Sequence, residues 1–288
     1  MSYDWSKFKV RCSAISKVLT YPQGKAPLTE VQRKRLSELS DKCKLTDNQR
    51  LEMAKLLLKE HEEEDIPLSP TCISYLMDSY AWNTYQKKSV SQELDIEYFT
   101  KGTKVEGESI ELLAEVDGLS YEKNKEIVEN DFLRGEPDIF IGPAILQAEK
   151  ITDIKSVWDY PKFLAKLHKD DDQSNNAQQI RGYMDITGAP VGEIAYCLVS
   201  MPEETISEYL RKLVYKMNVV TDQDPAYVRQ AAILELSMRF EDIPPHQRVF
   251  KVPIDPFTPS EQKQLYDRVK NCRDWLFKFD EFYQGLNI

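Results

Sequence analysis

Apolar residues recur every three or four positions over much of the first third of the chain, which is the spacing of one face of an α-helix. Between residues 28 and 65 these apolar positions are separated by charged ones. Thr46 and Asp47 interrupt the pattern before a second apolar run, and they are typical of a helix N-cap. We therefore predict two helices here and a helical N-terminal appendage over residues 1–65.

The remainder, residues 66–288, alternates between helix-like and strand-like patterns. Apolar spacing of three or four predicts helices, and short apolar runs beside turn residues predict strands. The helical patterns cover residues 70–86, 101–116, 174–187, 202–215, 225–240 and 259–282, and the strand-like runs cover residues 123–132, 137–141, 151–157, 194–200 and 248–254, with a turn at Arg134-Gly135. This order predicts an α/β core with extra helices.

Composition narrows the class of protein. The chain has 288 residues, of which 41% are hydrophobic and 30% charged, as in ordinary soluble globular proteins. No run of about 18 apolar residues is present to cross a membrane. The N-terminus lacks the basic and apolar segments of a secretory signal. We therefore expect a cytoplasmic protein that does not bind a membrane.

Cysteine usage and net charge exclude further classes. The five cysteines include no CxxC pair, so a zinc ribbon or a cysteine-held iron–sulfur cluster has no ligand set, and we expect reduced, mostly buried thiols. The net charge of −10 argues against a surface coated in basic charge for non-specific nucleic-acid binding. A nuclease stays compatible with this charge, because a metal-dependent site needs carboxylates and a basic groove can lie on an acidic body.

Three charged residues in the middle of the chain suggest chemistry. Asp138 begins one strand-like run, while Asp153 and Lys155 lie two apart on the next and so point to one face. If the two strands pair as a hairpin, the three groups converge at one edge of the sheet. Two carboxylates, with the backbone carbonyl of Ile154, suit Mg²⁺ or Mn²⁺. A neighbouring lysine can orient a metal-bound water and stabilise charge on a phosphate. A surface salt bridge is the default interpretation of an Asp-x-Lys pattern on a strand, so both interpretations stay open on these residues alone.

The same residues resemble the motif of the PD-(D/E)xK nuclease superfamily. Asp138 matches the first acidic residue, Asp153 the second and Lys155 the lysine. Gln179 and Tyr183 match the QxxxY motif of the RecB-type and lambda-exonuclease-like branch, on the helix after the catalytic strand. Residues four apart share a helix face, and in that branch the pair helps to position the active site and its DNA. The departure at position 153, Asp rather than Glu, removes no needed group.

A further motif of this branch is a Gly-Thr pair followed by a His or Glu that binds metal. Gly102-Thr103 followed by Glu106 resembles it. Glu108 and Glu111 are alternatives for the metal ligand, because the helix register is not fixed by one sequence.

The resemblance implies a restriction-endonuclease-like core, in which a central mixed β-sheet is flanked by helices. It further implies a Mg²⁺- or Mn²⁺-dependent deoxyribonuclease, more in keeping with an exonuclease that processes duplex DNA ends in recombination or repair than with an endonuclease. A phage or bacterial setting, a homo-oligomer and a single-strand-annealing or recombination partner protein are expectations by analogy. The alternative is a catalytically inactive nucleic-acid-binding or assembly protein on the same fold.

Four residues near the motifs are candidates for contacts with DNA. Trp158 can stack on a splayed base, and Arg134, Lys162 and Arg181 can contact phosphates. Each also has an ordinary interpretation, as a tryptophan that covers the core or as a basic residue in a salt bridge. Arg181 is the strongest of the basic candidates because it lies inside the motif helix.

Overall fold

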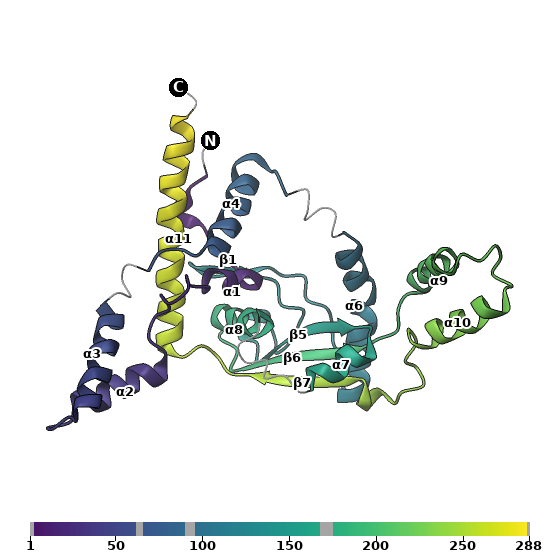
Figure 1. Ribbon diagram of the computed structural model, residues 1–288, viewed down its shortest axis with the longest axis horizontal. Helices are drawn as coiled ribbons and strands as arrows, with labels where there is room; N and C mark the ends of the chain where they lie inside the picture. Colours follow the sequence, from purple (N-terminus) through teal and green to yellow (C-terminus); the bar gives the residue numbers. More distant parts are fainter. Residues whose placement is uncertain (1–2, 62–65, 90–95, 168–174, 287–288) are drawn as a thin grey trace. The chain divides into compact units, whose positions relative to one another are not determined.

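The computed structural model describes residues 3–61, 66–89, 96–167 and 175–286, and for residues 96–104 it describes the backbone alone (Figure 1). The chain divides into two compact units. The first comprises Met1–Val10, Ala14–Lys88 and Phe257–Ile288, and the second comprises Arg11–Ser13 and Ser89–Pro256. This division differs from the predicted boundary after residue 65, because the last helix of the chain packs with helices near its beginning.

The second unit is built on a mixed four-stranded sheet. Its strands lie in the order β4 (Ile139–Ile141), β5 (Lys150–Val157), β6 (Val191–Leu198) and β7 (Val249–Ile254). β4 is antiparallel to β5, β6 is parallel to β5, and β7 is antiparallel to β6. The predicted α/β core with a mixed sheet is therefore confirmed.

Helices cover both faces of this sheet (Figure 1). α6 (Ile96–Asp117) packs on the face that includes Ile154 of β5. Asp153 points to the opposite face, since successive residues of a strand point to opposite sides. Asp153 accepts a hydrogen bond from Gln179 of α8 (Asn175–Thr187), so α8 covers the face opposite to α6.

β6 is the buried centre of the sheet. Its residues from Ile194 to Leu198 are at most 1% exposed. A strand covered on both faces has a nearly continuous apolar sequence, which explains why the run at 194–200 predicted it.

A smaller sheet replaces the long strand predicted at residues 123–132. Its strands lie in the order β1 (Val10–Arg11), β3 (Leu133–Gly135) and β2 (Val128–Glu129). The turn between β2 and β3 is formed at Asn130, whose side-chain oxygen accepts the backbone N–H groups of Phe132 and Leu133 at 2.9 and 2.8 Å. The turn predicted at Arg134-Gly135 was wrong, because an Asx side chain can cap a turn several residues earlier.

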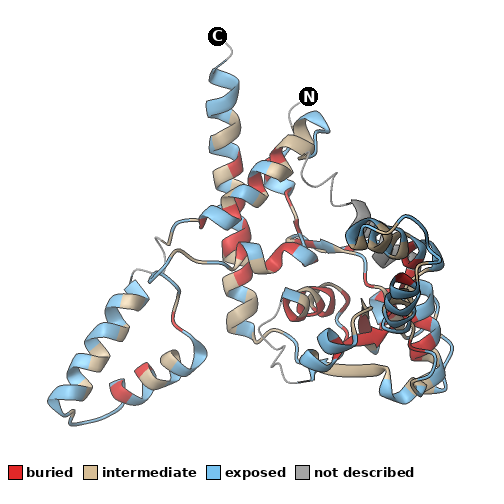
Figure 2. Ribbon diagram, turned by 45° about the vertical axis from the view of Figure 1, so that its right-hand side comes forward, coloured by how far each residue is buried: buried red, intermediate tan, exposed pale blue. Residues whose placement is uncertain are grey.

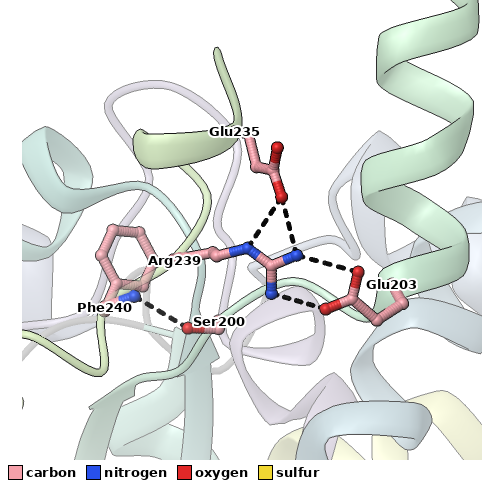
Figure 3. Close-up of polar contacts among 5 residues, drawn as sticks. All are labelled: Ser200, Glu203, Glu235, Arg239 and Phe240. Atoms are coloured by element: carbon pink, nitrogen blue, oxygen red, sulfur yellow. Dashed lines mark hydrogen bonds and ion pairs between the residues drawn. The ribbon is translucent and has the colours of Figure 1, made fainter. Parts of the chain in front are cut away.

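Two helices lie between β6 and β7 in the chain. α9 (Glu203–Met217) and α10 (Pro225–Leu236) are joined by Arg239, which hydrogen-bonds Glu203 and Glu235 at 2.9 Å each (Figure 3). A bidentate guanidinium pair fixes orientation as well as charge. Both helices were predicted, although α10 ends earlier than the expected residue 240.

The first unit is organised by α11 (Pro259–Gly285), which packs on α4 (Pro70–Tyr85). The Tyr80 hydroxyl donates a hydrogen bond to Asp280 at 2.7 Å. Arg268 of α11 is buried and donates to the backbone carbonyl of Ile66 at 3.0 Å. Contacts over some 200 positions of sequence are not visible to a local pattern, so they could not enter the predicted division of the chain. No helix in the described ranges, α11 included, has an apolar stretch of the length needed to cross a membrane.

The other helices of this unit are short or exposed. α2 (Glu30–Ser40) and α3 (Asp47–His61) are linked by Arg35 and Glu52, with nitrogen–oxygen distances of 2.9 Å. α3 has no buried residue (Figure 2). Thr46 caps α3 as predicted, since its hydroxyl accepts the Gln49 N–H at 3.3 Å. The remaining elements that the structure describes are η1 (Trp5–Lys7), η2 (Cys12–Ala14), α1 (Ile15–Val18), η4 (Ile145–Gln147), α7 (Tyr160–Lys166) and η5 (Pro245–Gln247).

The cysteines are free thiols, as expected for a reduced protein. Four are buried and Cys43 is exposed. The Sγ atoms of Cys72 and Cys272 lie 3.7 Å apart where α4 meets α11.

Candidate active site

The hairpin of β4 and β5 brings the two predicted acidic residues together. Ile139 is paired with Thr152 in an antiparallel register, and one further step sets Asp138 opposite Asp153. Directly opposed residues of an antiparallel pair point to the same side of the sheet. Both carboxylates therefore lie on the face covered by α8.

Backbone and side-chain bonds hold these groups in place. The N–H of Ile154 donates to Asp138 Oδ2 at 2.7 Å. Lys155 Nζ lies 2.6 Å from Asp153 Oδ2, and the Asp153 side chain is only 1% exposed. The N–H and C=O of one strand residue point to the same side, so the Ile154 carbonyl is also directed towards Asp138, beyond the end of β4.

α8 supplies the two residues of the predicted QxxxY motif. Gln179 Nε2 donates to Asp153 Oδ1 at 3.1 Å and to the Tyr183 hydroxyl at 2.7 Å. The four-residue spacing places both side chains on one helix face. The amide of Gln179 therefore fixes the orientation of the buried carboxylate, and Tyr183 fixes the amide.

A glycine makes room for the tyrosine. A Cβ on Gly135 of β3 would lie 2.3 Å from Cε1 of Tyr183 and 2.9 Å from Sγ of Cys12. These separations are too short for any larger residue to be accepted without movement. The Gly135 position in the Gly-Glu-Pro-Asp sequence is thus explained by packing against the motif helix.

Glu106 is the acidic residue of α6 that faces this site. Its charge acts on Asp138, Asp153 and Lys155. Its carboxylate forms an ion pair with the ammonium of Lys123.

The two alternatives to Glu106 lie elsewhere. Glu108 and Glu111 line a separate pocket of about 210 Å³, together with Glu241 and Arg248. Burial, with the charges of Glu111 and Glu241, raises the pKa of Glu108. The helix register therefore favours Glu106 over both alternatives.

Burial and mutual repulsion dominate the electrostatics of the carboxylates. Burial, followed by the charge of Asp153, raises the pKa of Asp138 to about 7. Burial also raises the pKa of Asp153, although Lys155 opposes the shift. Burial alone would lower the pKa of Lys155, but the carboxylates outweigh it, and the pKa of the ammonium is raised. The site therefore holds a charged lysine and an excess of acidic groups that resist full ionisation.

These groups fit a hard divalent cation by their chemistry. The donors are carboxylate oxygens and a backbone carbonyl, which Mg²⁺ and Mn²⁺ prefer. Asp153 Oδ2 is buried, and the Lys155 ammonium lies 2.6 Å from it. Among the described residues, no three His, Cys, Asp or Glu side chains lie close enough together to form a metal centre.

Solved structures that share this architecture are exonucleases. The phage-related exonuclease of Haemophilus somnus 129PT matches with a TM-score of 0.60 and 19% identity, over 96% of this chain and 97% of that chain. LHK-Exo, the alkaline exonuclease of Laribacter hongkongensis, matches in its complex with dAMP with a TM-score of 0.52 and 9% identity, over 98% of this chain and 96% of that chain. The chain has the fold of these exonucleases. The predicted restriction-endonuclease-like core is thereby confirmed. No protein-family model and no curated protein sequence matches the chain.

The four candidates for DNA contacts differ in how far they are exposed. Arg181 is 5% exposed, and its Nε donates to the Asp255 carbonyl at 3.0 Å. This burial disfavours a contact between Arg181 and phosphate, which stays a prediction. Lys162 is exposed beside Asp159, Arg134 is exposed on β3, and Trp158 is half-buried, so these three remain predictions.

Two residues that shape the site were missed from the sequence. Asn124 is buried, and its side-chain amide donates to the Pro137 carbonyl at 2.9 Å, while its backbone N–H donates to the Asp138 carbonyl at 2.8 Å. Lys123 precedes it and pairs with Glu106. Neither belongs to a recognisable motif, and a Lys-Asn pair in a polar loop carries no signal of its own.

We predict that Gly135→Ala destabilises the fold by about 1–3 kcal/mol, the usual cost of overpacking a close contact. Urea unfolding measures this change. Gly107→Ala is the matched control, because nothing lies within 4 Å of a Cβ there and a helical alanine is favoured over glycine by about 0.5–1 kcal/mol. Equal effects of the two substitutions would contradict the packing argument.

We predict that Asp138→Asn stabilises the metal-free protein at alkaline pH. The folded-state pKa of about 7 exceeds the ordinary value of 3.8, so the stability contributed by the protonated Asp138 is lost as the pH rises through about 7. One pKa unit corresponds to about 1.4 kcal/mol, so we expect a gain of about 2–4 kcal/mol at pH 8 and a smaller gain at pH 5.

Urea unfolding in the presence of a chelator, at the two pH values, checks this expectation. A gain that does not depend on pH would show that charge repulsion is not its source.

Proposed function

We propose that this protein is a divalent-metal-dependent deoxyribonuclease, and more specifically an exonuclease. The observation that carries the proposal is the convergence of Asp138, Asp153 and Lys155 on one hairpin, braced by Gln179. The fold shared with two exonucleases supports it. In contrast to a surface salt bridge, the Asp153–Lys155 pair is buried at its acidic end and lies beside a second carboxylate.

In this proposal Asp138, Asp153, Glu106 and the carbonyl of Ile154 hold Mg²⁺ or Mn²⁺. When bound, such an ion lowers the pKa of a water ligand and polarises the phosphate. The excess of negative charge that raises the pKa values of Asp138 and Asp153 is what a divalent cation relieves.

The residues of the chain supply the remaining chemistry. Lys155 stays protonated and presents an ammonium group that orients the attacking water and stabilises charge on the phosphate. Asp153 fixes that ammonium at 2.6 Å, and Gln179 fixes Asp153 in turn. Preorganised groups of this kind need no rearrangement as charge develops.

The substrate in this proposal is DNA, taken at duplex ends during recombination or repair in a bacterial or phage-infected cell. The dAMP complex of LHK-Exo, a deoxynucleotide complex of a protein with the same fold, supports the choice of DNA. The net charge of −10 makes long duplex contacts weak. A homo-oligomer or a recombination partner protein would compensate for that weakness by adding contacts.

We predict that the protein degrades linear duplex DNA with Mg²⁺ or Mn²⁺ and leaves covalently closed circles intact. Asp153→Ala and Lys155→Ala should each lower the rate by about 10²–10⁴-fold, the range for loss of a positioned catalytic group. Release of acid-soluble nucleotides measures the rate. Lys150→Ala is a control on the same strand, because Lys150 pairs with Glu193, which is not one of the site residues.

No degradation by the wild type with either metal, accompanied by binding to DNA, would favour the inactive binding protein. Nicked circles would instead favour an endonuclease.

We predict that Gln179→Ala lowers the turnover number more than Tyr183→Phe does. Gln179 touches Asp153 directly, whereas Tyr183 acts through Gln179. A loss of about 10–100-fold for the first and less than about tenfold for the second is expected for removal of a positioning hydrogen bond. Steady-state kinetics on linear DNA measure both, and the reverse order would contradict the indirect role of Tyr183.

A further inference from the structure

Lys123 is paired with Glu106, the acidic residue that the described side chains of α6 contribute to the site. Its ammonium forms an ion pair with Glu106, and the two side chains are 41% and 19% exposed. The carboxylate of Glu106 stabilises the charged form and raises the pKa of Lys123, and Asp138 and Glu136 add to the shift. Lys123 therefore lies at the outer edge of the acidic cluster as its counterion.

The loop that carries Lys123 is fixed beside Asp138 rather than free to leave. The next residue, Asn124, is buried and bonded to the carbonyls of Pro137 and Asp138 at 2.9 and 2.8 Å. The same side chain holds the loop on its other side, through the Glu126 carbonyl at 2.9 Å. The backbone position is thus set, while the lysine side chain itself is 41% exposed.

Charge counting shows what the ion pair does. Each of two lysines neutralises one carboxylate, Lys155 on Asp153 and Lys123 on Glu106. An oxygen that accepts from an ammonium group must exchange that partner before it coordinates a cation. Lys155 is held by burial of its partner, whereas Lys123 has an exposed route to solvent.

We propose that Lys123 is a positioning residue that holds Glu106 until a divalent cation binds and then releases it. The inference rests on the proposed metal-dependent function. Affinity of the site for the cation is then lowered by competition with the lysine. The released ammonium stands at the exposed edge, where a backbone phosphate of the substrate is a matching partner. Because coupling between two ligands is reciprocal, DNA and the cation strengthen each other's binding through this one side chain.

Calorimetric titration with Mn²⁺, in the absence of DNA, tests the competition. Lys123→Met should bind Mn²⁺ about three- to fivefold more tightly than the wild type, the range for an exposed ion pair. Lys125→Met is the matched control, because it removes the same charge from the same loop. An equal gain in Lys125→Met would overturn the proposal, since general electrostatics would explain it.

A double-mutant cycle gives the sharper test. In a Glu106→Gln background, Lys123→Met should no longer change Mn²⁺ affinity. A gain that persists without the Glu106 carboxylate would overturn the proposal. In a further titration with Ca²⁺, a short DNA duplex should raise the affinity of the wild type for the cation but not that of Lys123→Met. Equal enhancement in both proteins would also count against the proposal.

These experiments distinguish the role of Lys123 from the metal-dependent nuclease function on which it rests. If the wild type binds Mn²⁺ and degrades DNA while Lys123→Met binds with unchanged affinity, the role of Lys123 fails and the nuclease stands. If neither the wild type nor Lys123→Met binds a divalent cation, the metal-dependent function itself fails.

Discussion

The burial of two carboxylates side by side is the constraint on which the rest of the site depends. Asp138 and Asp153 face each other across a hairpin, and Asp153 is nearly inaccessible to water. Buried charges of like sign are costly unless they are paired or protonated. The two carboxylates are surrounded by the lysines, the Gln179 amide and the Ile154 N–H. Each of these groups offsets part of the free-energy cost of burying the carboxylates. The neighbouring packing, including Gly135 under Tyr183, keeps these partners in register.

This arrangement places stability and chemistry in opposition. A hairpin with apolar residues at both positions would fold more favourably, because no carboxylate would be desolvated. The acidic pair is tolerable because the surrounding sheet is well packed: β6 is buried from Ile194 to Leu198, and α6 and α8 cover the two faces. The packed core thus compensates for the free-energy cost of the buried carboxylates, as expected where function conflicts with local preference.

How far the structure was predictable depended on the range of the interactions involved. The hairpin and the face shared by Asp153 and Lys155 follow from strand periodicity, and the spacing of Gln179 and Tyr183 follows from the helix. These rules depend only on residues close together in sequence, and the structure contains each feature that they predict. Lys123 reaches Glu106 over seventeen positions, and Tyr80 reaches Asp280 over two hundred. The sequence does not identify either of these pairs, because many other charged or polar residues could form the same interaction.

The first unit is made from both ends of the chain, with Ser89–Pro256 inserted between them. Its organising helix, α11, is therefore synthesised after the inserted stretch, which contains all four strands β4, β5, β6 and β7 of the larger sheet. Domains fold as units once their residues are available. The nuclease-like unit can thus form its core on the ribosome while α4 still lacks the helix it packs against. Until that helix arrives, the apolar faces of the N-terminal helices are exposed to chaperones and to other chains.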